Sequence, residues 1–379
     1  MPTTTDLRNL PAAALEEFCG GLGLPPAKAR QVFSWLYRPG TADFSAKGTL
    51  GRDVRRLLSK HTRVSRLEPA RVEQSRDGTL KYAFRLEDGA VIESVLIPGN
   101  GRHTLCISSQ AGCAMGCRFC LTAGMGLRRD LTPAEIVNQV VAVREQMLRA
   151  GIVRPTPRQL IDNLVFMGMG EPLANYGSLV TALAILMDER GLGFSERRVT
   201  VSTCGLARRI VDLGRDARVN LAVSLHAADD AIRGALMPVN RACGVDELLA
   251  ACRAYALGGG RVIFFECVLL AGLNDSPEDA RKLAAKLRGI PCRINLLPYN
   301  VSELLPYRPS PPGSIAAFKE VLAAAGFRVL VRNSRGADIA AACGQLAGNA
   351  GTAPYAEARS DEESPAVAAL RPPTLRAIE

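Results

Sequence analysis

The sequence predicts an α/β protein built around a mostly parallel sheet. From residue 101 to about residue 346, short apolar strand patterns alternate with amphipathic helical patterns. Six of these strand patterns form a series of βα units, and their ends carry small or polar residues. Hydrophobic residues make up 47% and charged residues 22% of the 379 residues, which suits a large core. We therefore expect a partial (βα)6 barrel of the TIM-like kind.

The first part of the chain, residues 1–62, is expected to form a helical accessory domain. Helical patterns cover residues 10–24, 25–38 and 50–61, and Pro26 suits a first helical turn. Five arginines would give this domain a basic face: Arg30, Arg38, Arg52, Arg55 and Arg56. Such a face suits contact with RNA, although an ordinary solvated helical surface explains it equally well.

A change of period marks the next part, residues 63–100. Residues 79–98 alternate apolar and polar side chains around an Asp88–Gly89 turn, which is typical of a β-hairpin. We expect a small β extension that leads into the main domain.

The main domain is expected to span residues 101–346. Its strand patterns are at residues 103–110, 163–170, 198–205, 219–227, 261–270, 292–300 and 326–333. Helical patterns lie between them, at residues 133–150, 177–190, 276–289 and 315–325. In a βα barrel the carboxyl ends of the strands share one mouth, where the chemistry takes place. Residues 347–379 are rich in Ala, Pro and Glu and are expected to be disordered.

Net charge, signal-peptide and membrane patterns, and cysteine content indicate the class of partner and the cellular compartment. A net charge of +10 and a pI of about 9.2 favour polyanionic partners, although an arginine-rich composition can arise without one. No apolar run is long enough to cross a membrane, and the N-terminus lacks a signal-peptide pattern. We therefore expect a cytoplasmic protein. In that compartment the eleven cysteines are not a disulfide framework.

Three cysteines stand close together after the first strand of the series. Cys113, Cys117 and Cys120 have C-x3-C-x2-C spacing, and three soft ligands suit an iron–sulfur cluster. Three cysteines leave one corner of a four-iron cluster open to an outside ligand. A structural zinc site is the alternative, but it needs a fourth Cys or His, and only His103 lies near, before the loop.

This spacing, with Phe119 before the last cysteine, resembles the radical S-adenosylmethionine superfamily. The resemblance implies one [4Fe–4S] cluster on the three cysteines, with S-adenosylmethionine bound to the open iron and cleaved to a 5′-deoxyadenosyl radical. The G-M-G-E-P motif at residues 168–172 resembles the superfamily's glycine-and-glutamate element, which contacts the amino group of the cofactor. A carboxylate suits an ammonium group, although a tight turn alone can also use this motif.

A closer resemblance covers residues 5–348. It is to the dual-specificity 23S rRNA and tRNA adenine-C2 methyltransferases, the RlmN family. The stretches that carry it are ESVLIP, CISSQAGCAMGCRFC, GMGEPLANY, VSTCG, SLHAADDAIR, INLLPYN and RGADIAAACGQLAG. The last is the most specific, because it lies far from the cluster motif and contains Cys343.

The resemblance implies a carrier mechanism that uses two molecules of S-adenosylmethionine per turnover. The first methylates the sulfur of Cys343, and the radical from the second removes a hydrogen from that methyl group. The carbon then joins C2 of the adenine, which links RNA to protein. Glu93 matches the family's proton acceptor, and Cys106 matches the thiol that resolves the adduct through a transient disulfide with Cys343. By pattern alone, Glu93 would be a surface strand residue.

The resemblance also implies cofactor contacts and partners. The contacts are Gly170, Glu171, Ser202, Ser224, Leu225, His226 and Asn300. By residue type alone, His226 is more typical of a satisfied strand-end histidine. The implied partners are 23S rRNA, tRNA methylated next to the anticodon, and an electron donor such as a flavodoxin-type protein. No membrane is expected, and a monomer suffices. The family's Pro-rich continuation after Asn300 is replaced by VSELLPY.

Three alternatives stay open at this point. The first is the sister activity that methylates adenine C8 and confers antibiotic resistance, which would use the same cluster and the same pair Cys106 and Cys343. The second keeps the radical chemistry but acts on a protein or a small molecule, and it needs neither of those two cysteines. The third is a non-enzymatic RNA-binding protein with a structural metal, which leaves the polar strand ends unexplained.

Overall fold

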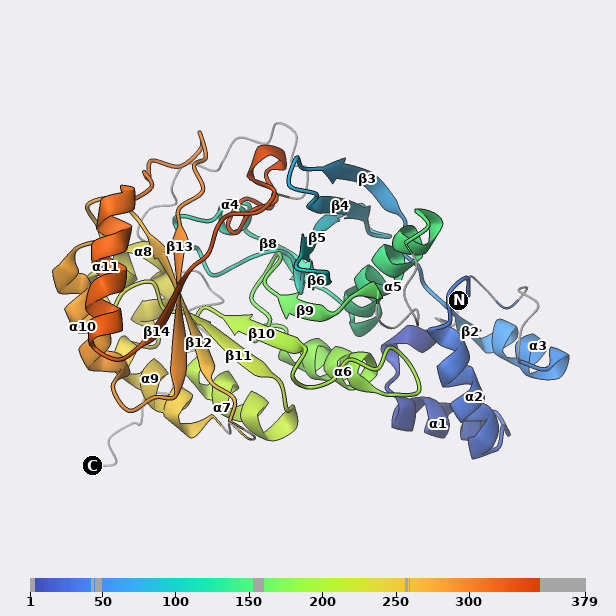
Figure 1. Cartoon of the computed structure of the whole chain (residues 1–379). Coiled ribbons are helices and arrows are strands. Elements are labelled where there is room, and N and C mark those ends of the chain that lie inside the picture. The colour runs from blue at the N-terminus through green and yellow to red at the C-terminus, as the bar shows by residue number, and fades with distance from the viewer. Residues whose placement is uncertain are drawn as a thin grey trace, which may run out of the picture.

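The architecture is a curved, open sheet with helices on its outer side (Figure 1). The computed structural model describes residues 4–41, 44, 50–152, 160–255, 258 and 260–347. The expected disorder of residues 347–379 therefore concerns residues that, apart from Ala347, lie outside the described part. No helix within the described residues is long and apolar enough to span a membrane.

Ten strands form the main sheet, in the order β14-β13-β12-β11-β10-β9-β6-β5-β4-β3. Every neighbouring pair from β6 to β14 is parallel, and the pairs from β3 to β6 are antiparallel. The antiparallel strands are β3 (Pro69–Gln74), β4 (Leu80–Arg85) and β5 (Val91–Gly99). The parallel strands are β6 (Arg102–Cys106), β9 (Asn163–Phe166), β10 (Val199–Thr203), β11 (Asn220–Ser224), β12 (Ile263–Leu269), β13 (Cys292–Pro298) and β14 (Arg328–Val331).

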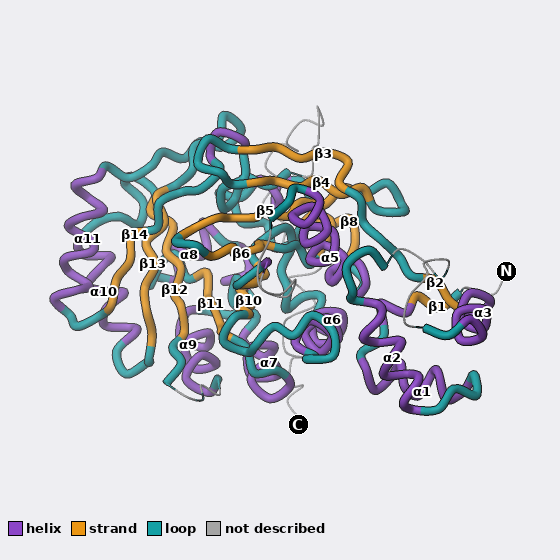
Figure 2. The backbone as a smooth tube through the Cα atoms, turned by 45° about the vertical axis from the view of Figure 1, so that its right-hand side comes forward, coloured by secondary structure: helices purple, strands orange, loops and turns teal. Residues whose placement is uncertain are grey.

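Six helices that connect the parallel strands lie in sequence around the outside of the sheet (Figure 2). They are α5 (Pro133–Arg149), α6 (Tyr176–Met187), α7 (Ala207–Asp216), α9 (Val245–Ala254), α10 (Pro277–Leu287) and α11 (Pro312–Ala324). Helix α8 (Asp230–Leu236) lies between β11 and α9 in the chain. Helix α5 begins with a capping box between Thr132 and Glu135, and Ser276 and Asp279 form another at α10. The expected α/β fold with a partial barrel is confirmed.

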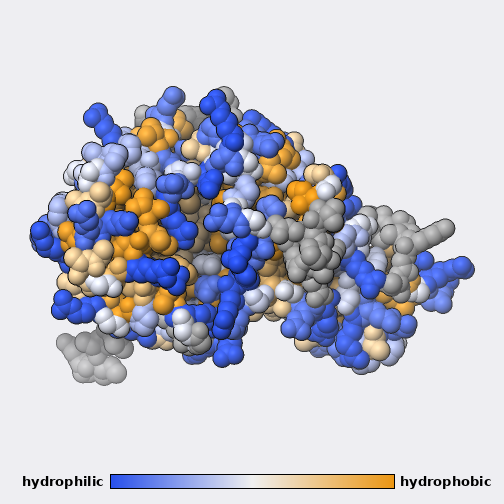
Figure 3. Space-filling model, viewed as in Figure 1, coloured by the Kyte–Doolittle hydropathy of each residue, from blue (hydrophilic) through white to orange (hydrophobic). Residues whose placement is uncertain are grey.

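A helical region precedes the sheet, and it contains α1 (Ala12–Gly21), α2 (Pro26–Leu36) and α3 (Arg52–His61). A short parallel pair, β1 (Thr5–Asp6) and β2 (Thr62–Arg63), joins its two ends. Many hydrophilic side chains lie on its visible face (Figure 3). Of the five arginines, all but the half-buried Arg55 are exposed. Two of the exposed ones approach acidic partners, Arg30 with Glu16 and Arg56 with Asp53.

The helical region is fastened to helix α5 by buried polar side chains. Arg8 is only 1% exposed, and its guanidinium donates to Oδ1 of Asn138 at 2.8 Å, to Leu36 O at 2.9 Å and to Ser65 O at 3.0 Å. Arg144 of α5 reaches back and donates to Tyr37 O. Buried polar groups stabilise a fold only when they are paired, so these bonds fix where the helical region attaches.

The end of the chain crosses the open side of the barrel. After β14 it runs over to β3 and β4, at the opposite edge of the sheet (Figure 1). There Asp338 accepts bonds from Ser75 Oγ at 2.6 Å and Arg76 N at 3.1 Å, and Gly336 N donates to Asp77 Oδ2 at 3.1 Å. We call residues 332–347 the crossing segment. It includes a single 3-10 turn, η4 (Ala337–Ile339).

The attachment through Arg8 gives a stability prediction. Arg8→Met should lower the free energy of unfolding by about 2–4 kcal/mol, because at least two buried carbonyl oxygens lose their donor. Urea denaturation followed by circular dichroism measures the change, with the exposed Arg30→Met as the control. A loss equal to that of the control would contradict the attachment.

Candidate active site

The carboxyl ends of the parallel strands converge on one side of the barrel, and the three-cysteine loop lies there. The loop follows β7 (Gln110–Gly112) and ends at the short helix α4 (Leu121–Gly124). Strand β8 (Leu127–Asp130) returns to pair with β7. Gly112 has φ +82°, and a Cβ there would lie 2.0 Å from Gly126 O, so only glycine allows this pairing.

The three thiols of the loop influence one another. Burial raises the pKa of Cys113 to about 12, and charge on Cys120 and Glu171 adds to the effect. Burial also raises the pKa of Cys117, with Cys113 and Cys120 as further causes, and that of Cys120. Thiols this close and this desolvated stay neutral unless a cation is bound among them. A metal cluster supplies that positive charge, and its ligands are thiolates.

The number and sequence spacing of these cysteines suit a four-iron cluster, in which each cysteine binds a different iron atom. Within the described ranges, no group of three or more His, Cys, Asp and Glu side chains surrounds one metal position. His103, the candidate fourth ligand of a zinc site, does not lie in the cysteine loop. It lies at the start of β6, where its Nδ1 is 3.1 Å from Leu160 O.

The end of β9 carries the glycine-and-glutamate motif. A Cβ on Gly168 would lie 2.7 Å from the carbonyl carbon of Ile107, and one on Gly170 would lie 2.4 Å from Gln110 Cβ. These glycines therefore allow the β9 end to pack against the segment after β6. The close approach at these two glycines is therefore between two segments of the protein.

Glu171 is a buried carboxylate suited to a cationic ligand. It is 3% exposed, and it accepts bonds from Cys204 N at 2.7 Å and Leu173 N at 3.0 Å. Burial raises its pKa, and the backbone donors oppose that shift. Hydrogen bonds from the side chains of Cys204 and Thr203 also lower its pKa, and a carboxylate in this position suits an ammonium group. Cys113 and Cys117 both respond to its charge.

The ends of β10 and β11 bring Ser202, Ser224, Leu225 and His226 to the same side. His226 has φ +61°, which is strained for a residue other than glycine, and such strain is common at functional sites. Its Nδ1 accepts from Val268 N at 3.0 Å, so a neutral ring carries its proton on Nε2. Burial and the nearby Arg233 lower its pKa to about 3.

Two further residues tie His226 and the strand ends to the cysteine loop. Phe119 packs edge-on against the His226 ring, with the ring centroids 4.8 Å apart. Arg233 is fully buried and donates to Leu225 O at 3.1 Å and to Cys204 O. Its charge lowers the pKa of Cys117, against the burial that raises it. Arg233 lies in a stretch that carried the family resemblance, but no role for it followed from the sequence.

Glu93 and Cys106 lie on one face of the sheet. Cys106 pairs with Val95, two residues from Glu93 on β5, so both side chains project from the same face. Glu93 is 1% exposed, so the alternation-based expectation of a surface strand residue is wrong. The neighbouring crossing segment covers this position. Burial, with a smaller contribution from Cys343, raises the pKa of Cys106.

Cys343 reaches this site on the crossing segment. Gly344 O accepts from Leu121 N at 2.8 Å beside the cysteine loop, and Ala347 N donates to Glu93 Oε2 at 3.0 Å. Asn300, an expected cofactor contact, donates to Cys343 O at 3.2 Å and so also holds the crossing segment. Cys106 and Cys343 are both free thiols.

The surroundings of the Cys343 thiol are unusual. The residue is exposed, yet burial raises the pKa of its thiol to about 11, and charge on Glu266 and Cys120 adds to the effect. The thiol is therefore surrounded by protein atoms, while the residue as a whole stays accessible.

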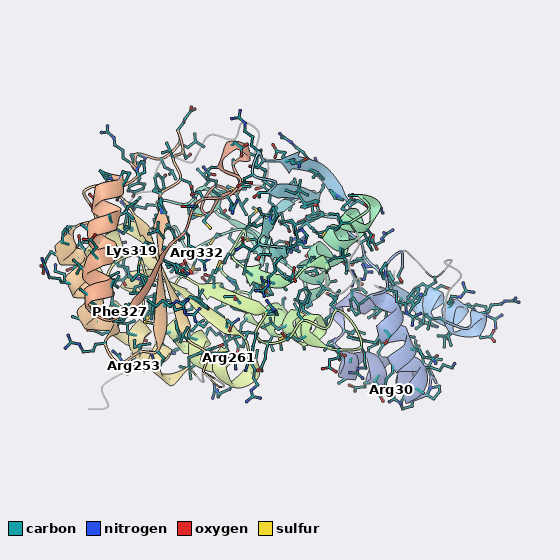
Figure 4. The ribbon with its side chains drawn as sticks, in the orientation of Figure 1. Arg30, Arg253, Arg261, Lys319, Phe327 and Arg332 are labelled. Carbon is teal, nitrogen blue, oxygen red and sulfur yellow. The ribbon has the colours of Figure 1, made fainter. Side chains whose placement is uncertain are left out.

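A polar row on the other half of the sheet was not found from the sequence. Ser224 of β11 pairs with Glu266, which pairs with Asn295 of β13, so the three side chains share a face. Asn295 donates to Glu266 Oε1 at 2.7 Å and accepts from Arg332 Nε at 3.2 Å. Arg332 is labelled in Figure 4. Polar residues inside apolar strands were the available signal. Arg129 of β8 forms ion pairs with Asp88 and with Glu135.

Comparisons with known proteins define the class of this site. Residues 107–284 match the model of the radical SAM superfamily, and residues 5–64 match the model of the ribosomal RNA large subunit methyltransferase N-terminal domain. The chain is a radical S-adenosylmethionine protein with a methyltransferase-type N-terminal domain. Its cofactors are therefore one [4Fe–4S] cluster and S-adenosylmethionine, which the thiols and Glu171 fit.

Relatives define the family. A dual-specificity RNA methyltransferase RlmN from Desulfotalea psychrophila is 50% identical over 90% of this chain and 94% of that protein. Another, from Anaeromyxobacter dehalogenans, is 49% identical over 92% of this chain and 93% of that protein. A crystal structure of a radical SAM methyltransferase from Sphaerobacter thermophilus gives a TM-score of 0.84 at 43% identity, over 91% and 99% of the two chains. The chain belongs to the RlmN family of dual-specificity RNA methyltransferases.

The environment of His226 gives a pH prediction. With its pKa at about 3, the ring should stay neutral through pH 5–8, whereas an unfolded histidine titrates near 6.5. Because the unfolded chain then binds this proton first, the His226 contribution to stability should be lost as the pH falls from about 6.5 to about 3.

Nuclear magnetic resonance of the three histidine rings checks this directly. One ring, assigned by a His226→Gln variant, should show no titration between pH 5 and pH 8. A midpoint near pH 6.5 for that ring would contradict the described burial.

Proposed function

We propose that the protein methylates C2 of adenine in 23S rRNA and in tRNA next to the anticodon, with Cys343 as the methyl carrier. The observation that supports this most directly is the placement of Cys343. Its segment is bonded on one side to the cysteine loop, through Gly344, and on the other to Glu93. A radical enzyme that acts on a protein or small molecule has no use for this arrangement.

The three cysteines Cys113, Cys117 and Cys120 would hold the cluster. When bound, the cluster and S-adenosylmethionine supply a carbon radical by one-electron cleavage of the sulfonium. Glu171 would receive the ammonium of the cofactor, while Gly170, Ser202, Ser224, Leu225, His226 and Asn300 would line its other contacts. His226 would stay neutral there, because its pKa lies far below physiological pH.

The remaining steps belong to three side chains. Once the carbon carried by Cys343 has joined C2, the base must lose one electron, which the oxidised cluster could take up, and the C2 proton, which Glu93 would accept. The thiolate of Cys106 would then bond to Sγ of Cys343 while the Sγ–carbon bond breaks. The released carbon keeps the bonding electrons and takes up a proton, which completes the methyl group. The two thiols are left as a disulfide, which must be reduced before the next turnover.

The proposal extends to partners and domains. Residues 1–62 would be an RNA-binding domain, residues 63–100 a β extension that supplies Glu93, and residues 101–346 the radical core. A flavodoxin-type protein would donate the electron. The chain would act as a monomer in the cytoplasm, where tRNA and ribosomes are found. The net charge of +10 suits an RNA substrate.

A trapping experiment tests the carrier mechanism. The protein is reconstituted with its cluster anaerobically and given S-adenosylmethionine, a reductant and a tRNA or rRNA fragment. Cys106→Ala should accumulate a covalent RNA–protein adduct visible on a denaturing gel, because no thiol resolves it. Cys343→Ala should give neither adduct nor product, and Cys252→Ala, at a buried cysteine of α9, should behave like the wild type.

Turnover by Cys343→Ala would refute the carrier role. Digestion of the RNA product then separates the two adenine activities. The proposal requires 2-methyladenosine, and 8-methyladenosine would assign the chain to the alternative activity.

A further inference from the structure

A buried lysine next to Glu93 has no role in the mechanism so far. We propose that Lys81 is a positioning residue, which holds the Glu93 carboxylate and the crossing segment that carries Cys343 in fixed places relative to each other. This inference rests on the proposed function, because it deepens the role given there to Glu93.

Lys81 touches both parts at once. Its Nζ donates to Ile339 O of the crossing segment at 2.6 Å, and it lies 3.7 Å from Glu93 Oε1 and 3.0 Å from Glu73 Oε2. The other oxygen of Glu93 accepts from Ala347 N at 3.0 Å. One ammonium group and one carboxylate therefore hold the segment at two points, four residues before Cys343 and four residues after it.

The sheet register aligns these groups. Lys81 of β4 pairs with Val95, and Val95 pairs with Cys106 of β6. Glu93 lies two residues from Val95, so Lys81, Glu93 and Cys106 project from one face. This face combines the proposed base, the proposed resolving thiol and a cation that touches the carrier segment. Nothing in the packing of a small hairpin needs that combination.

Because the Lys81–Glu93 ion pair is buried, it contributes little to the stability of the fold. The Lys81 side chain is 7% exposed and that of Glu93 is 2% exposed. A buried ion pair is often no more stabilising than an apolar pair of the same size, because both charges lose their water. Glu73 also has a second partner, since Arg71 approaches its Oε1 at 2.6 Å. A gain in stability therefore does not explain why Lys81 is buried at this position. Its contacts with the Glu93 carboxylate and with the crossing segment that carries Cys343 do explain it.

Other ionisable groups surround the pair. The groups on the same sheet face are Arg71 and Glu73 of β3, Arg85 of β4, and Arg102 and Cys106 of β6. Those on the crossing segment are Arg332, Arg335, Asp338 and Cys343. Lys81 forms an ion pair with Glu93 and also donates to the crossing segment. Its removal should therefore release both the Glu93 carboxylate and Ile339 O from this contact.

The first test follows release of the covalent adduct at pH 7, in the reconstituted protein. In Lys81→Met, the adduct should form but release about tenfold more slowly than in the wild type, because the Glu93 carboxylate is no longer held in place. Lys81→Arg should restore most of the rate at pH 7. Lys319→Met, at an exposed lysine of α11, is the matched control.

The second test needs no cofactor. In the protein without its cluster, iodoacetamide labelling of Cys343 is followed by mass spectrometry of its peptide. Lys81→Met should label Cys343 several-fold faster than the wild type, because Ile339 O has lost its anchor. Lys81→Arg and Lys319→Met should label at the wild-type rate.

The outcomes separate the two proposals. If Cys106→Ala traps no adduct, the proposed function fails whatever Lys81 does. If the adduct is trapped but Lys81→Met matches Lys319→Met in both tests, only the role of Lys81 is refuted. Should Lys81→Met not fold, Lys81→Gln decides, because it keeps a donor for Ile339 O without the charge. It should release the adduct slowly at pH 7, and a wild-type rate would overturn the inference.

Discussion

The site depends on one constraint: an irregular segment must place Cys343 at the mouth of a barrel that is open on one side. Hydrogen bonds from both sides of that opening do this. Asp338 is bonded to Ser75 and Arg76 beyond β3, while Asn300 after β13 donates to the Cys343 carbonyl. A segment held at both sides can carry a reactive group across the opening.

The buried ionisable groups of the site suit the charges of the cluster and cofactor that would bind there. Three desolvated thiols, the buried carboxylate Glu171 and the buried cation Arg233 lie around the strand ends. Binding of a positively charged cluster would turn the thiols into thiolates, and an ammonium group would satisfy Glu171. The protein should therefore be most stable when loaded, because metal and cofactor binding remove the cost of these buried groups. The strained backbone of His226 belongs to the same region.

Much of the fold was predictable, because its strands are apolar runs that end in recognisable motifs. The cysteine spacing and the stretch around Cys343 also indicated the chemistry from the amino-acid sequence alone. Burial of Glu93 was not predictable from alternation, since the crossing segment that covers it is far away in sequence. The position of Lys81 could have been predicted, because the Asp88–Gly89 turn fixes the hairpin register and places Lys81 on the same face as Glu93. The role of Arg233 could not, because its carbonyl partners on two strand ends depend on tertiary structure.

The most direct test of the central claim is to measure modified nucleosides in cells with and without the gene. Ribosomal RNA and tRNA are purified separately, digested, and analysed by mass spectrometry, and a Cys343→Ala allele is compared with the wild-type allele. Loss of 2-methyladenosine from both pools, restored by the wild-type allele alone, is the result we expect. Unchanged 2-methyladenosine in both pools would contradict the account.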